Sequence, residues 1–91
     1  MAKTRAFGGI TESIWQCVKS TSEREHGTKY DPADGNQGTS TTDTFVGKVI
    51  LSYDFEPSKE TITYVINQKP FIVTDDQIWN GLQETIDHCK R

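Results

Sequence analysis

The sequence has few of the residues on which metal sites and membrane segments depend. Its two cysteines, Cys17 and Cys89, form no Cys-X-X-Cys pair, so a structural zinc site is nearly excluded. The longest uninterrupted apolar runs, residues 49–51 and 71–73, fall far short of the ~20 residues of a membrane helix. Glycine-rich phosphate-binding motifs are also absent. We therefore predict no metal, no cofactor and no membrane partner.

An excess of positive charge is lacking as well. Lysine and arginine number 10 against 13 aspartates and glutamates, which gives a net charge of -3. Duplex binding depends on neutralising phosphates, and only residues 1–9, with Lys3 and Arg5, are basic. We predict no nucleic-acid partner.

The first residues also lack the apolar stretch of a signal peptide. A cytoplasmic location is therefore expected, where Cys17 and Cys89 would be free thiols. In an exported protein, the same two cysteines could instead form a bridge between the two helices predicted below.

The apolar residues fall in patterned segments, which indicates a folded chain. Residues 27–43 are polar and without periodicity, and they are long for a connection, whose median length is about 4–6 residues. We expect a long loop there. Residues 1–9 are interpreted as a flexible tail and residues 10–91 as a single small domain.

Two segments carry helical signals. Ile10, Ile14 and Val18 follow helical spacing, Thr11 is a suitable N-cap, and Gly27 can end the helix, which predicts a helix over residues 11–26. A capping box formed by residues 74–77 begins a second apolar stripe, which predicts a helix over residues 75–89.

Residues 45–55 and 60–68 alternate between apolar and polar side chains, which predicts a β-hairpin with a turn at residues 56–59. Placing Glu56 opposite Lys59 sets three apolar pairs on one face: Tyr53 with Ile62, Leu51 with Tyr64, and Val49 with Ile66. Residues 71–73 are a candidate for a short extra strand. The predicted fold class is α+β, in the order α-β-β-(β)-α, with two helices packed on one face of an antiparallel hairpin sheet.

The other face of the predicted hairpin suggests a partner surface. In the same register Ile50 lies opposite Val65, and Val46 extends their row. Single apolar residues on an exposed face are ordinary, but so small a sheet needs additional stabilisation. We therefore predict a non-enzymatic protein-interaction module. Its partner would be a second copy, giving a homodimer joined through the sheet, or another protein.

Two alternatives remain open. The first is a small-molecule-binding protein with a pocket between helices and sheet near Trp15, Trp79 and Gly81, because a glycine on the buried side of a helix leaves room. The second is an enzyme that uses Cys17 or Cys89 as nucleophile. That chemistry requires a histidine within reach of the thiol, and sequence neighbours on a helix point apart. No catalytic residue is predicted.

Overall fold

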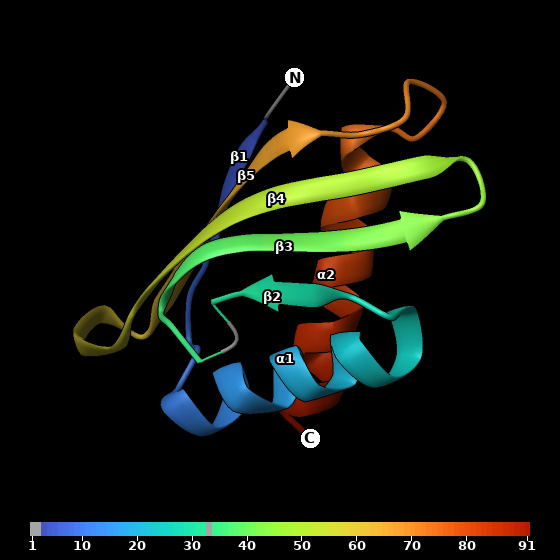
Figure 1. Ribbon diagram of the computed structural model, residues 1–91. Helices are drawn as coiled ribbons and strands as arrows, with labels where there is room; N and C mark the ends of the chain where they lie inside the picture. Colours follow the sequence, from blue (N-terminus) through green and yellow to red (C-terminus); the bar gives the residue numbers. More distant parts are fainter. Residues whose placement is uncertain (1–2, 33) are drawn as a thin grey trace.

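The computed structural model describes residues 3–32 and 34–91. In this part of the chain two helices pack on one face of an antiparallel sheet of five strands, in the order β1-β5-β4-β3-β2 (Figure 1). The elements are β1 (Thr4–Phe7), α1 (Glu12–His26), β2 (Lys29–Asp31), β3 (Gln37–Thr44), β4 (Gly47–Glu56), the short 3-10 helix η1 (Pro57–Lys59), β5 (Thr61–Gln68) and α2 (Asp75–Cys89). This arrangement confirms the α+β class and the placement of both helices on one face.

Both helices begin and end where the capping chemistry predicts. The Thr11 hydroxyl accepts a hydrogen bond from the Ile14 amide at 3.2 Å, and Gly27 ends α1 in the left-handed region with φ of 66°. Thr74 and Gln77 form the complete capping box of α2. These interactions span only a few residues, so they can be recognised without knowing the rest of the fold.

The β4–β5 hairpin exists, but the predicted register is wrong by two residues. Tyr53 pairs with Tyr64 and Leu51 with Ile66, because η1 and a left-handed Glu60 together make a wider turn than predicted. A shift by two residues keeps every side chain on its face, so the predicted buried face is retained.

Segments predicted to be unstructured contribute three strands, which corrects both the tail and the long loop. Phe7 is only 6% exposed and fixes β1 beside β5, where the Ile66 amide donates to the Lys3 carbonyl at 2.8 Å. In the predicted loop, β3 pairs with β4 along its whole length, and its threonines are β-branched residues that favour strands. Residues 1–2 of the predicted tail and residue 33 of the predicted loop lie outside the described residues.

Two apolar segments are exposed where the sequence indicated strand. Residues 71–73 form a turn and not an extra strand, with the Val73 amide donating to the Pro70 carbonyl at 3.0 Å. Phe71 is 93% exposed, and Phe45 is fully exposed in the turn between β3 and β4. The two turns are neighbours, since Gly47 lies against the Pro70 ring. Phe45 therefore does not join the buried face.

A disulfide joins the two helices. Cys17 of α1 and Cys89 of α2 are bonded, with Cα atoms 5.8 Å apart, so the expectation of two free thiols is wrong. Each cysteine lies on the inward side of its helix, and packing both helices on one face brings the two positions together. No helix in the described part of the chain is long and apolar enough to cross a membrane.

Candidate functional site

A cavity of about 190 Å3 lies between the sheet and α2, beside the C-terminal end of α1. Figure 1 shows α2 crossing behind β3 and β4. The residues facing each other across this space are small: Ser40 and Thr42 on β3, and Gly81 and Thr85 on α2. A Cβ atom added to Gly81 would meet nothing within 4 Å. The helix and the sheet therefore leave between them a pocket, open to the surface, that no side chain fills.

The cavity wall combines apolar groups with hydroxyl groups. Its apolar part comes from β4 and α2, through Val49, Leu51, Ile78 and Leu82. None of the described residues that line it is a lysine, arginine, aspartate or glutamate. The exposed imidazole of His26 is also among its lining residues. A charged ligand would lose hydration and find no lysine, arginine, aspartate or glutamate partner, so the wall favours an uncharged molecule.

Most hydroxyl groups in the wall are already hydrogen-bonded within the protein. The hydroxyls of Thr28 and Thr42 lie 2.7 Å apart. Thr85 donates to the Gly81 carbonyl at 3.1 Å, and Ser22 donates to the Val18 carbonyl at 2.8 Å. These hydrogen bonds hold the wall together and engage hydroxyl protons, while the hydroxyl oxygens keep lone pairs that can accept.

Tyr64 differs from the other tyrosine of the wall in its hydrogen bonding. Its side chain is 1% exposed, and its hydroxyl has no hydrogen-bond partner within the described residues. Burial raises the pKa of Tyr64 well above its usual value, so the group stays protonated and keeps its donor. An unpaired buried donor costs about 1–3 kcal/mol.

Two further residues of the wall carry hydroxyls. Ser40 is buried, with 5% of its surface exposed. Burial raises the pKa of Tyr30 to about 12, against the opposing effect of a hydrogen bond with Ser22. Neither tyrosine hydroxyl of the wall ionises near neutral pH.

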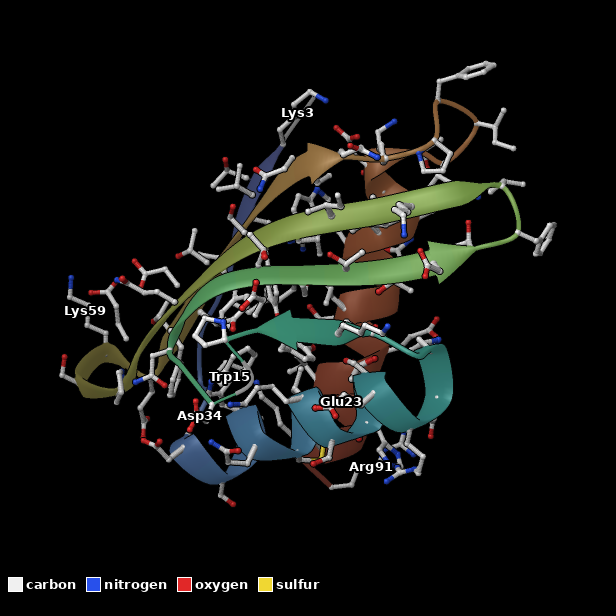
Figure 2. The ribbon with its side chains drawn as sticks, in the orientation of Figure 1. Lys3, Trp15, Glu23, Asp34, Lys59 and Arg91 are labelled. Carbon is white, nitrogen blue, oxygen red and sulfur yellow. A yellow bond between two sulfur atoms is a disulfide. The ribbon has the colours of Figure 1, made fainter. Side chains whose placement is uncertain are left out.

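The predicted pocket residues separate into two groups. Gly81 lines the cavity as predicted, whereas Trp15 and Trp79 do not. Trp15 is fully buried between α1 and the sheet (Figure 2), with ring centroids 5.2 Å from Tyr53 and 5.7 Å from Phe55. Both tryptophans are buried members of the hydrophobic core.

The predicted partner surface is less continuous than the sequence indicated. Val46 lies in the turn between β3 and β4, and Val65 pairs with Ser52 and not with Ile50. Ile50 is half-buried and pairs with Gln68 beyond an irregularity in the strand. Exposed fractions of 41% for Val46 and 37% for Val65 leave these two side chains accessible on separate parts of the molecule.

Sequence reasoning missed the residues that make the cavity polar. Tyr64 was assigned to the apolar face of the hairpin, and Ser40 and Thr42 were placed in the predicted loop. Small residues alternate at Gly38, Ser40 and Thr42, which is a strand pattern that could have indicated a thinly filled face. Both cysteines are in the disulfide, so neither offers the free thiol that a cysteine nucleophile needs.

No protein-family model matches the chain, and comparisons with curated proteins and with solved structures find no significant match.

Proposed function

We propose that this protein binds a small uncharged molecule in the cavity between α2 and the inner face of the sheet. The observation that carries the proposal is the unfilled space of about 190 Å3 between α2 and the sheet, where no side chain stands opposite Gly81. A concave and mostly apolar pocket with a few polar groups is the usual form of a small-molecule site.

The volume sets the size of the ligand. An engineered apolar cavity of about 150 Å3 admits benzene. The present cavity of about 190 Å3 accommodates a single ring with a small substituent. Its walls are also held in place, because the disulfide ties α1 to α2 across the helix layer. A preorganised cavity loses less conformational entropy when it binds.

The disulfide also bears on where the protein works. Disulfides persist in oxidising compartments and are rare in the cytosol. We propose an oxidising compartment for this chain in place of the cytoplasmic location expected from composition. Reversible oxidation in the cytosol is the alternative, and thiol labelling of the protein in intact cells separates the two.

Filling the cavity tests the proposed function. In Ser40→Ile the added side chain enters the cavity from β3, and isoleucine suits a strand. We expect a folded protein that no longer binds a neutral one-ring probe such as toluene, measured by chemical-shift changes in NMR. Thr41→Ile is the matched control, because it adds the same side chain to the next residue, which faces away from the helices. Equal binding by both variants would overturn the proposal.

Self-association through the outer face of the sheet is a second candidate. The observation that favours it is that both helices cover one face, so Ile50 and Val65 have no covering layer on the other. A second copy, or another protein, would shield these side chains. This candidate does not exclude ligand binding, because the cavity lies on the opposite side of the sheet.

A further inference from the structure

We infer that a second pocket, between β1 and the C-terminal half of α2, binds the phosphate group of a small molecule through Arg5 and Lys90. This pocket has a volume of about 220 Å3, and none of its described lining residues lines the cavity beside Gly81. The inference therefore does not depend on the proposed function. Its basis is that two cationic side chains from opposite ends of an acidic chain meet at one small pocket.

The register of β1 places Arg5 on the side of the sheet that the helices cover. Arg5 pairs with Tyr64 of β5, and Phe7 follows two residues later on the same face. Both of these neighbours are buried in the core. Because β1 is an edge strand, the Arg5 side chain is nevertheless exposed. Its guanidinium carbon lies over the Phe7 ring, 5.4 Å from the ring centroid.

Lys90 reaches the same place from the end of α2. Its Nζ donates to the Gly8 carbonyl at 3.3 Å, and Gly8 directly follows the phenylalanine beneath the Arg5 guanidinium. The two cationic groups are thus held against consecutive residues of the chain. Neither forms a salt bridge with any described residue. Like charges held close together repel each other, and an anion bound between them relieves that repulsion.

The remaining lining residues add no charge that would compete with an anion. Among the described residues the pocket wall contains no aspartate or glutamate. Asp87, in the last turn of α2, accepts a hydrogen bond from the Gln83 amide at 2.9 Å and does not line the pocket. The wall therefore presents two positive charges and no negative side chain.

The donors favour a phosphate group over a carboxylate. A phosphate monoester carries a charge of about -1.5 to -2 at pH 7, which compensates both cations, whereas a carboxylate compensates one. The planar guanidinium of Arg5 can donate to two phosphate oxygens, and the Lys90 ammonium can donate to a third. The pocket is larger than the ~150 Å3 that admits benzene, so a small organic group fits beside the phosphate.

Three small anions test the chemistry of the ligand: methyl phosphate, inorganic phosphate and acetate. NMR titrations of the full chain follow the backbone amides of Gly8 and Lys90. We expect saturable shifts at these amides, with methyl phosphate binding about tenfold more tightly than acetate because it engages a second cation. Inorganic phosphate distinguishes the two sources of the group: tighter binding of methyl phosphate indicates an organic ester, and equal binding indicates free phosphate.

Charge-removing variants test the two residues. Arg5→Gln and Lys90→Gln should each weaken methyl phosphate binding by about tenfold, the effect of one charge-assisted hydrogen bond. Lys29→Gln is the matched control, because it removes the same charge from β2, the opposite edge of the sheet. It should leave the affinity unchanged. Asp87→Asn removes a negative charge beside Gln83 and should tighten binding.

Three results would overturn the inference. The first is the lack of saturable shifts at Gly8 and Lys90 with either phosphate compound. The second is equal affinity for acetate and methyl phosphate, which would mean that the site does not select a phosphate group. The third is an equal loss of affinity in Lys29→Gln and Arg5→Gln, which would show a general attraction to positive charge. None of these results affects the proposed function, because that concerns the other pocket.

Discussion

The two halves of the helix–sheet interface differ in how they are filled. Around Trp15 the aromatic rings of Tyr30, Tyr53 and Phe55 pack within 6.0 Å of the indole, measured between ring centroids. Beside Tyr64 the interface leaves an open pocket of about 190 Å3. Both halves use the same face of the same strands, so the difference comes from the size of the side chains set against them.

Tyr53 and Tyr64 show this difference at a single cross-strand pair. They are direct partners on β4 and β5, and both side chains are buried. The Tyr53 hydroxyl reaches a backbone carbonyl in the loop after β2, whereas the Tyr64 hydroxyl reaches no partner among the described residues. The closely packed half provides stability, and the incompletely filled half is the ligand site that we propose. The following variants test this difference between the two halves of the interface.

The largest effect is expected in the filled half. Trp15→Ala removes a fully buried side chain and leaves a void that its aromatic neighbours cannot close. Substitutions of this kind cost about 3–5 kcal/mol. We expect a smaller loss for Leu82→Ala, because that side chain is half-buried beside space that is already empty. Urea unfolding of both variants measures the two losses of stability. Equal losses would contradict the proposed difference between the filled and the unfilled half.

Breaking the disulfide should have the next largest effect. The bridge closes a chain segment with a sequence separation of 72 residues. Removing it by Cys17→Ala should lower the free energy of unfolding by about 2–4 kcal/mol. Thermal unfolding with and without a reductant checks this result: the reductant should destabilise the wild-type protein and leave the variant unchanged. A wild-type protein indifferent to reductant would contradict the prediction.

Alkaline pH should destabilise the protein through its buried tyrosines. Burial raises the pKa of Tyr30 to about 12 and that of Tyr64 well above its usual value. The unfolded chain therefore releases these protons at a lower pH than the folded protein. The free energy of unfolding therefore keeps the full contribution of these two tyrosines below pH ~10. Above that pH the free energy of unfolding falls by up to about 1.4 kcal/mol per pH unit for each tyrosine.

Urea titrations between pH 8 and 12 measure this slope, and the two tyrosines can be separated by substitution. Tyr64→Phe should make the slope shallower by removing one of the two groups. An unchanged slope in that variant would show that Tyr64 ionises in the folded protein as readily as in the unfolded chain.

Removing one hydroxyl at a time compares the paired tyrosines directly. Tyr53→Phe deletes a hydrogen bond to the Pro32 carbonyl and should cost about 1 kcal/mol. Tyr64→Phe deletes an unpaired buried hydroxyl and should be neutral or stabilising by up to about 1 kcal/mol. Urea unfolding at neutral pH measures both. A loss in Tyr64→Phe equal to that in Tyr53→Phe would mean that the Tyr64 hydroxyl is already satisfied in the ligand-free protein.

The smallest effect on stability concerns the uncovered face of the sheet. Ile50→Lys places a charge on that face and should change the free energy of unfolding by no more than about 0.5 kcal/mol. If the second candidate function is right, the same change converts a dimer into a monomer in analytical ultracentrifugation. A wild-type protein that is monomeric at all concentrations would remove self-association from consideration.

Local signals were reliable guides to the helices and to the hairpin faces. Thr11, Gly27 and the capping box after Val73 mark the helix ends, and alternation along β4 and β5 identifies the buried face. The predicted hairpin register was wrong because Glu60 adopts a left-handed conformation. The alternation of apolar and polar residues does not reveal that conformation. Pairing of β1 and β2 could not be predicted, because these short polar strands are stabilised by neighbours distant in the sequence.

The sequence by itself determined where the helices begin and end and which hairpin side chains are buried, because capping and periodicity act over a few residues. Only the tertiary structure decided the sheet order, the joining of Cys17 to Cys89 and the position of the cavity. These features depend on which side chains meet across the helix–sheet interface. Small residues on β3 face Gly81 and Thr85 of α2, and Tyr64 lines the same space.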